Sequence, residues 1–170
     1  RINMKCTECG SNMKKTKGNY NYRESGIDKV NLQGIPIYVC KCGHEIPSIL
    51  HVEQLHELIA IDVVKQKRLL MGQEVRFLRK AMGLKAVDLA KILNVTKVTV
   101  SRWESDDSKI GDANDKLLRL LYLDKKGLLQ RIMKNVQSVL ETTTAAEPVG
   151  ATPPIYISAK ELEKYHAGIY

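Results

Sequence analysis

The chain has 170 residues, enough for one medium domain or two small ones, and apolar residues make up 44% of it. Aromatic residues make up only 5%, which argues against a large catalytic core rich in aromatic side chains. Lys and Arg outnumber Asp and Glu by 27 to 19, so the formal net charge is +8 and a polyanionic partner such as nucleic acid is favoured. No apolar run approaches the roughly 18 residues of a membrane helix and no basic-then-apolar leader is visible, so we expect a cytoplasmic protein without a membrane partner.

All four cysteines lie near the start of the chain, as two close pairs. The pairs read CTECG at residues 6–10 and CKCG at residues 40–43. A disulfide framework would spread its bridges along a secreted chain, whereas two close pairs, each followed by glycine, are typical of knuckles that supply four thiolates to a tetrahedral Zn²⁺ ion. We predict one structural zinc per chain, with these ligands: Cys6, Cys9, Cys40 and Cys42. Iron, a redox role and disulfides are less favoured alternatives, and His44 is an alternative fourth ligand because the second pair has a short spacer.

Between the two pairs the pattern predicts a small zinc-binding β domain over residues 4–48. Short strands are expected over residues 19–23, 28–32 and 35–39, with turns at 25–26 and 33–34. A unit of roughly 45 residues buries too little apolar surface to be stable alone, which gives the metal a structural role. Three tyrosines are interpreted as covering the metal core in preference to facing a partner: Tyr20, Tyr22 and Tyr38.

Residues 49–70 are predicted to form a connecting helix. Apolar side chains recur there with a helical period, and Ser48 stands where an N-cap is expected. His51 and His56 lie five residues apart in this stretch, a spacing that does not put two ligands on one helix face. Both are therefore interpreted as ordinary surface histidines.

Residues 71–140 are predicted to form an all-α bundle. Its helices are expected over residues 73–82, 85–93, 96–105, 112–123 and 128–140. Gly83 and Asn94 end the first two helices at positions that favour a left-handed turn, and Thr96 caps the third. Two short helices joined by a tight turn fit a helix-turn-helix. The apolar surface over 112–123 exceeds what one short helix usually buries, so part of it is expected to form a dimer contact.

The segment Leu84–Glu104 resembles the Cro/C1-type (Xre) helix-turn-helix, and its most specific part is Val100-Ser101-Arg102-Trp103-Glu104. Together with the CxxCG pair and the second cysteine knuckle, this motif makes residues 4–140 similar to the MqsA (YgiT-type) antitoxin family. The fold implied is α+β with two domains, a small β zinc-binding domain followed by an all-α helix-turn-helix bundle. One recognition helix reads only a few base pairs, so we expect a homodimer through the C-terminal domain, bound to a palindromic operator in double-stranded DNA. The resemblance to an antitoxin also implies a small RNA-cleaving toxin bound by the N-terminal domain.

The helix that opens at Thr96 carries the predicted base contacts, because the second helix of this motif lies in the major groove. Residues one turn apart share its exposed face, which gives this outward set: Lys97, Val98, Ser101 and Arg102. Arg102 is expected to form a bidentate pair with guanine O6 and N7, and the resemblance implies a base contact at the same position. Val98 stands where the family has a polar residue, so an apolar contact and a different operator are expected. Trp103 is assigned to the core.

Other positions are expected to touch phosphate or to hold the fold. The phosphate or mixed contacts are assigned to Lys97, Thr96 and Thr99, and further possible phosphate partners are Lys85, Arg76, Arg79 and Lys109, although any of the basic residues also fits an ordinary solvated charge. Ala86 stands where the fold often has Gln, so that contact is missing here. Glu104 is expected to pair with an arginine, because an acid near phosphate groups is repelled.

The tail over residues 141–170 has a different composition, and its role is undecided by the sequence. Residues 141–154 read as a linker, 155–157 as a short strand, and 158–165 as one or two helical turns. Ser158 is the expected N-cap of these turns, with Glu161 at the capping-box position.

These patterns favour a sequence-specific transcriptional regulator that acts in the cytoplasm at the bacterial nucleoid. The leading hypothesis is the antitoxin of a type II toxin–antitoxin pair that represses its own operon. Alternatives are a stand-alone Xre regulator of a mobile element or prophage and a thiol- or metal-sensing repressor. An enzyme is the least favoured class, because no nucleophile elbow, phosphate loop or HExxH motif is present and a zinc with four protein ligands has no open position.

Overall fold

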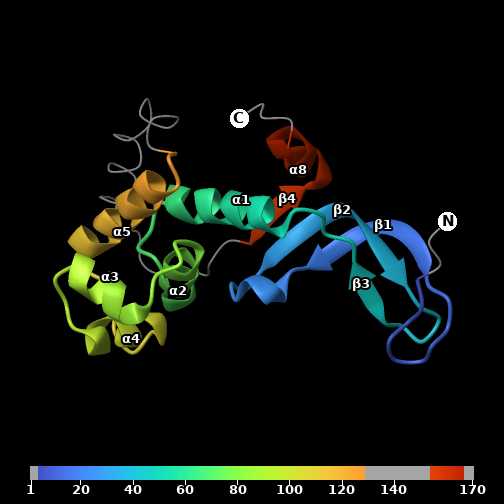
Figure 1. The fold of residues 1–170 in the computed structure, drawn as a ribbon, viewed down its shortest axis with the longest axis horizontal. Coiled ribbons are helices and arrows are strands. Elements are labelled where there is room, and N and C mark those ends of the chain that lie inside the picture. The colour runs from blue at the N-terminus through green and yellow to red at the C-terminus, as the bar shows by residue number, and fades with distance from the viewer. Residues whose placement is uncertain (1–3, 129–153, 167–170) are drawn as a thin grey trace. The chain divides into compact units, whose positions relative to one another are not determined.

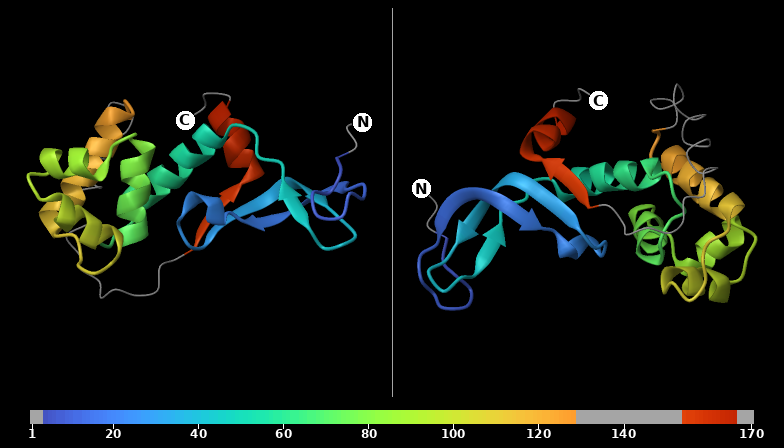
Figure 2. Two further views of the ribbon diagram at one scale, coloured as in Figure 1. Left: turned by 60° about the horizontal axis from the view of Figure 1, so that its bottom comes forward. Right: turned by 180° about the vertical axis from the view of Figure 1, so that it is seen from behind.

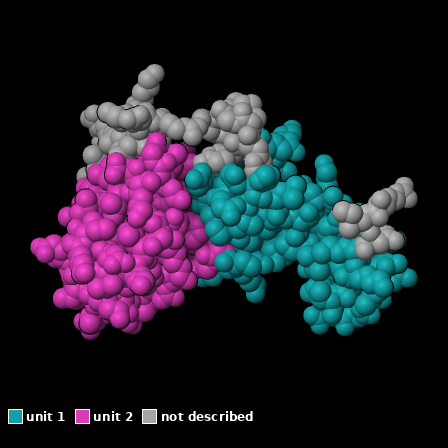
Figure 3. Space-filling model, in the orientation of Figure 1, with its two compact units in different colours: residues 1–24, 28–58, 154–170 teal, residues 25–27, 59–153 magenta. Residues whose placement is uncertain are grey.

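A computed structural model of the chain describes residues 4–128 and 154–166. The chain divides into two compact units (Figure 3): a sheet unit of residues 1–24, 28–58 and 154–170, and a helical unit of residues 25–27 and 59–153. A small β-sheet region followed by a helical region is the α+β class that the sequence predicts. Within the described residues, no helix is both long enough and apolar enough to span a lipid bilayer.

The sheet unit is built around one long central strand, β2 (Val30–Val39), as Figure 1 shows. Along one edge β2 pairs antiparallel with β1 (Lys14–Asn21). Its other edge is shared between β3 (Glu45–Pro47), antiparallel at one end, and β4 (Ile155–Ser158), parallel at the other. A short 3₁₀ turn, η1 (Arg23–Ser25), follows β1. Four strands from both ends of the chain therefore form one sheet.

The expected turn at residues 33–34 is wrong, because β2 continues through it as one strand. Gly34 has a φ of +68° and sits where the register with β1 shifts between Gly18 and Tyr20. Its N–H donates to Asn19 Oδ1 at 3.2 Å. A single left-handed glycine in a strand produces a β-bulge as readily as a turn, and only the pairing with β1 distinguishes the two.

Alternate side chains of β2 form the core of the sheet unit. Val30, Leu32, Ile35 and Ile37 are buried, and the bulge preserves their common face by absorbing the extra residue. Burial on one face only is typical of a sheet covered by helices on one side.

Helix α1 (Val52–Lys65) is shorter at both ends than the predicted 49–70. His51 has a left-handed φ of 61°, which stops the helix from extending further towards the N-terminus. Ser48 does not cap the helix; its N–H donates to the Pro36 carbonyl at 2.8 Å and ties the chain to β2. At the other end the buried Arg119 guanidinium donates to carbonyl oxygens of Val63 and Val64, so the chain turns away after Lys65.

The helical unit contains α2 (Gly72–Ala81), α3 (Ala86–Ile92), α4 (Lys97–Glu104) and α5 (Asp112–Lys125). Gly83 and Asn94 both have positive φ, +70° and 52°, so the left-handed turns predicted after α2 and α3 are confirmed. Val100 and Trp103 are buried, as predicted for the inward face of α4. The further helix predicted over 128–140 lies outside the described residues.

The described part of the tail folds onto the sheet unit. Strand β4 covers the predicted strand at 155–157, and α8 (Ala159–His166) follows it directly. The Glu161 carboxylate accepts from the backbone N–H and the hydroxyl of Ser158, both at 2.7 Å, which confirms the predicted cap. The two views in Figure 2 show β4 beside β2.

Candidate metal centre and DNA-binding surface

Two tight loops bring the cysteine pairs together. In the first, the Gly10 N–H donates to the Cys6 carbonyl at 2.9 Å, and in the second the Gly43 N–H donates to the Cys40 carbonyl at 3.0 Å. Gly10 and Gly43 have φ values of +70° and +89°, which non-glycine residues rarely adopt. The glycine after each pair is therefore required by the loop geometry that the sequence predicts.

The four cysteine sulfurs form one group, with all Sγ atoms within 4.8 Å of one another. Cys6 and Cys42 Sγ lie 3.6 Å apart, and Cys9 and Cys40 Sγ lie 3.4 Å apart. A disulfide needs about 2.05 Å, and a tetrahedral ion with metal–sulfur bonds of about 2.3 Å has sulfur–sulfur edges of about 3.8 Å. The cysteines are thus positioned to bind a metal ion, and the donor set fits a structural zinc.

His44 is not a member of this group. Its Nε2 lies 3.3 Å from the Thr7 hydroxyl, while its backbone carbonyl accepts from the Cys40 N–H at 2.9 Å. The short spacer between Cys40 and Cys42 is accommodated by the loop itself, so the geometry favours four sulfur ligands over a substituted histidine.

The thiols differ in how readily they lose a proton. Hydrogen bonds from Ser11 lower the pKa of Cys9 to about 6. For Cys42, the hydrogen bond from the His44 N–H is the largest single effect and lowers the pKa. The hydrogen bonds with Cys40 and Cys9 together outweigh it and raise the pKa of Cys42 to about 12. Cys9 therefore loses its proton more readily than Cys42, and a bound divalent ion would favour the thiolate form of both.

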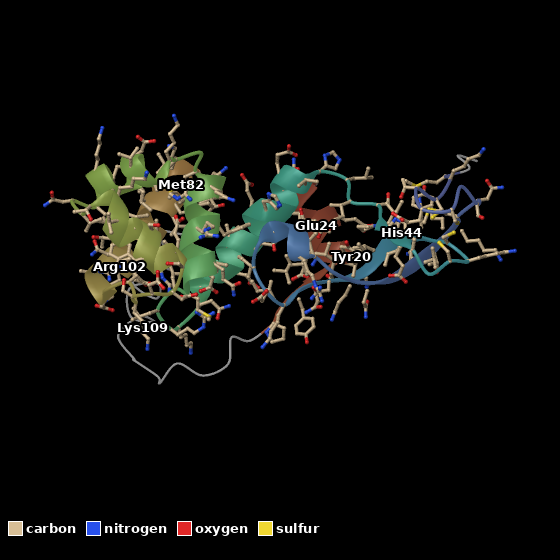
Figure 4. The ribbon with its side chains drawn as sticks, turned by 90° about the horizontal axis from the view of Figure 1, so that it is seen from below. Tyr20, Glu24, His44, Met82, Arg102 and Lys109 are labelled. Atoms are coloured by element: carbon tan, nitrogen blue, oxygen red, sulfur yellow. The ribbon has the colours of Figure 1, made fainter. Side chains whose placement is uncertain are left out.

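A small apolar cluster backs the cysteines. Cys6, Cys40 and Met13 are buried, and Tyr38 packs against them together with Met4 and Ile46. The expectation that tyrosines cover this region holds for Tyr38. Tyr20 and Tyr22 lie elsewhere: their hydroxyls bond to Glu24 at 2.7 Å and to His56 at 2.9 Å. Figure 4 labels Tyr20, Glu24 and His44 on this unit.

His56 is not the ordinary surface histidine that the sequence analysis describes. It is half-buried, with its Nε2 at 2.9 Å from the Tyr22 hydroxyl, and burial lowers its pKa below the ordinary value. His51 is exposed, as expected. The difference arises because Tyr22, which directly follows β1, lies 34 residues away from His56 in the sequence.

In the helical unit, α4 presents a polar face to solvent. Its N-cap is Thr96, whose hydroxyl accepts from the Thr99 N–H at 3.1 Å. The predicted outward set is exposed along the helix: Lys97, Val98, Ser101 and Arg102. Val98 is 65% exposed, so its apolar side chain lies on the same solvent-facing surface. Figure 4 labels Arg102 on α4 and Lys109 in the loop that follows.

The remaining predicted contacts lie close to this face. The hydroxyl groups of Thr96 and Thr99 form a hydrogen bond of 2.8 Å at the start of α4. Lys85 is exposed at the N-cap of α3, where its backbone N–H donates to the Asp88 carboxylate at 3.1 Å. Two of the assigned threonines therefore already form the helix cap, and Lys85 keeps its ammonium group at the surface.

Glu104 holds the helices together, as predicted. Its carboxylate is nearly buried and pairs with Arg79 through Nε and, at 2.9 Å, through Nη2, while Arg76 lies 3.4 Å away. Arg79 Nη1 donates to the Leu84 carbonyl at 2.8 Å. Arg79 is thus engaged within the fold, which makes it a poorer candidate for phosphate contact than Arg76, whose side chain stays half-exposed.

The end of α4 is fixed to the start of α2 at Gly72, a position that the sequence analysis missed. The Gly72 N–H donates to the Asp106 carboxylate at 2.7 Å, and a Cβ on Gly72 would clash with the Trp103 carbonyl oxygen. Asp106 has a positive φ of 60° in the turn after α4. A lone glycine before a helix gives no sequence signal for such a close approach, because the residues that it meets lie more than thirty positions later.

Residues 75–114 match a helix-turn-helix family model. The match spans α3 and α4 and the geometry described above, and this family supports a DNA-binding regulator. No curated protein and no solved structure matches the chain. The chain therefore combines a helix-turn-helix domain with a four-cysteine cluster near its N-terminus.

Proposed function

We propose that this protein is a transcriptional regulator that reads a specific operator in double-stranded DNA through α4. The observation that carries this proposal is the exposed face of α4 within the matched helix-turn-helix, with Lys97 and Arg102 outward while Trp103 is buried. The excess of basic residues, with a net charge of +8, supports binding to a polyanion.

Arg102 is proposed as the main base-reading residue. Its side chain is exposed, and among the described residues no hydrogen bond or ion pair holds its guanidinium in the fold, in contrast to Arg79. Val98 is proposed to touch a thymine methyl group, the one apolar feature of the major-groove edge. Lys97, Ser101, Thr96, Thr99 and Lys85 are proposed as phosphate or mixed contacts.

The test compares Arg102→Ala and Arg102→Lys on operator and on random DNA. Loss of the bidentate pair should weaken operator binding by about 1–3 kcal/mol in both variants, whereas Arg102→Lys should retain binding to random DNA because it keeps the charge. Fluorescence anisotropy at several salt concentrations measures both. Equal losses on the two DNAs would assign Arg102 to phosphate contact alone.

We further propose the biological role of an antitoxin that represses its own operon. The support is the combination of a four-sulfur metal site with a helix-turn-helix in one chain, which resembles the MqsA-type arrangement. In this role a zinc-bound N-terminal domain over residues 4–48 binds a small RNA-cleaving toxin. The helix-turn-helix domain dimerises, partly through the exposed Leu117 of α5, on a palindromic operator.

Co-expression with the product of the adjacent reading frame tests this role. Cells that express the adjacent product alone should stop growing, and co-expression of the intact chain should restore growth. The adjacent product should also co-purify with the intact chain. Their absence, together with specific operator binding, would favour a stand-alone regulator of a mobile element. A monomer at micromolar concentration with and without DNA, seen by analytical ultracentrifugation, would contradict the homodimer.

A thiol- or metal-sensing repressor is the second candidate, and one observation favours it. Cys9 and Cys42 are exposed whereas Cys6 and Cys40 are buried, so two of the four sulfurs are open to oxidants or chelators. Parallel loss of metal and of operator binding on mild oxidation would support sensing. Operator binding that survives metal loss would contradict it.

A further inference from the structure

The C-terminal segment is bound by the sheet unit as a peptide ligand would be. Strand β4 pairs in parallel register with the edge of β2 at Val30–Gln33, next to the stretch that β3 covers. The Ile155 N–H donates to the Lys29 carbonyl at 2.9 Å. In the sequence, residues 129–153, outside the described part of the chain, lie between α5 and this segment.

We propose that the edge of β2 over Val30–Gln33 is a strand-binding site, and that residues 154–166 of the same chain are its ligand. The site takes an extended apolar segment with isoleucines at alternate positions, followed directly by a capped helix. The sheet unit, which also carries the four cysteines, therefore needs residues 154–166 to cover the free edge of β2.

Alternation of side chains gives the site its selectivity. Ile155 and Ile157 are only 3% and 4% exposed, and they lie opposite Val30 and Leu32, both fully buried. Tyr156, between them, is 55% exposed. Removal of the segment would uncover an apolar row of the sheet core. The site therefore selects apolar side chains at the first and third positions of the bound strand and accepts polar or apolar side chains at the second.

The helix that follows fixes where the strand ends. Ser158 pairs with Gln33 as the last residue of β4, and it also caps α8 through its hydroxyl and the Glu161 carboxylate. Helix α8 then lies against β2 and β4. A one-residue slip would turn both isoleucines to the exposed side, so the alternation specifies the register, while the Ser158 cap specifies where the strand ends and α8 begins.

Substitutions at neighbouring positions of β4 test the site in the full-length chain. Ile155→Asp with Ile157→Asp should abolish hydrogen-exchange protection of the Val30–Gln33 amides. Tyr156→Asp is the control, because it places a new negative charge at the exposed position of the same strand, and it should leave that protection unchanged. Equal effects of the two variants, or none from the isoleucine pair, would overturn the proposal. Operator binding, measured in parallel, reports on the helical unit independently.

A synthetic peptide of residues 153–167 provides a second measurement. Added to the Ile155→Asp, Ile157→Asp chain, it should restore protection of the same amides with saturable binding, whereas the peptide that carries both substitutions should not. Failure of the native peptide at millimolar concentration would contradict a strand-binding site.

A cross-link identifies the chain that supplies the ligand. Asn31 and Tyr156 are opposite in the parallel register, so Asn31→Cys with Tyr156→Cys should form a disulfide within one chain. On a non-reducing gel the product should migrate as a monomer. A cross-linked dimer would overturn the assignment to the same chain and indicate exchange of the segment between two copies.

Discussion

At the scale of single residues, buried charges of the helical unit hold the connection that leads into α2. Arg119 and Asp115 are both fully buried and pair at 2.7 Å on α5. Arg119 also donates to the carbonyl oxygens of Val63, Val64, Gln66 and Arg68, and Asp115 accepts from the Leu70 N–H at 2.7 Å. These two side chains therefore satisfy backbone groups that the end of α1 leaves without helical partners.

Arg119→Met should be strongly destabilising. It leaves the Asp115 carboxylate buried without its cation and the carbonyls without their donor, and breaking such a buried pair costs about 3–5 kcal/mol. Lys116→Met is the control, because Lys116 pairs with Asp112 on the same helix at the same spacing but at the surface. Its loss should cost about 0.5 kcal/mol or less. Urea denaturation measures both, and similar effects would show that burial of the pair is unimportant.

His56 gives the sheet unit a pH dependence. Burial lowers the pKa of His56 in the folded protein, so the unfolded chain, with an ordinary pKa of about 6.5, takes up the proton first. The neutral, half-buried His56 therefore contributes to the free energy of unfolding fully above about pH 6.5. This contribution is lost as the pH falls from about 6.5 through the pKa of His56 in the folded protein. His56→Gln should remove this part of the loss of stability at low pH. His51→Gln, at an exposed position on the same segment, should not, and thermal unfolding between pH 5 and 8 distinguishes them.

At the scale of elements, the recognition helix depends on its anchoring as much as on its own sequence. Helix α4 has only eight residues, which is too short to be stable alone. It is fixed at its start by the Thr96 cap, and at its end by Glu104, which pairs with Arg79, and by Asp106, which accepts from Gly72. Orientation of the exposed face is thus set by contacts on the opposite side of the helix.

Gly72→Ala should displace the end of α4. The new methyl group overlaps the Trp103 carbonyl oxygen, and relief of such overpacking costs about 1–3 kcal/mol. Operator affinity should fall as well, because the helix shifts. Gly111→Ala is the matched control, since Gly111 also lies at the start of a helix but has no atom within 4 Å of the added Cβ. The control should cost about 0.5 kcal/mol. Unchanged operator affinity in a folded Gly72→Ala protein would contradict this anchoring.

At the scale of the whole molecule, the two units rely on different sources of stability. The helical unit has a continuous apolar core that includes Val75, Leu78, Leu89 and Tyr122. Around the cysteines the buried apolar cluster is small, with Met13 the one buried member that is not a metal-ligand candidate. A metal ion is therefore expected to stabilise one end of the sheet unit and to matter little for the helical unit.

Removal of metal by a strong chelator should therefore have a local effect. Amides of residues 4–13 and 40–46 should lose hydrogen-exchange protection, whereas those of α2–α5 should keep theirs. Readdition of Zn²⁺ with release of protons should restore the signal, since thiols must deprotonate to bind it. Loss of protection across both units would contradict separate sources of stability.

The sequence by itself determined the features that depend on neighbours a few residues away. The paired cysteines with their glycines, the Thr96 cap, the left-handed Asn94 and the Ser158 cap each need only a local pattern, because a loop or helix end is specified by a handful of adjacent backbone groups. The outward face of α4 followed from helical periodicity in the same way.

Only the tertiary structure decided the features whose partners are distant in sequence. Gly34 is a bulge because β1 pairs beside it, His56 is shielded because Tyr22 packs on it, and α1 ends where Arg119 meets its carbonyls. The same reason applies to β4, whose Ile-Tyr-Ile pattern predicts a strand but cannot specify the edge that it joins. Such pairings depend on which surfaces meet after the chain collapses, and local residue patterns carry no information about that meeting.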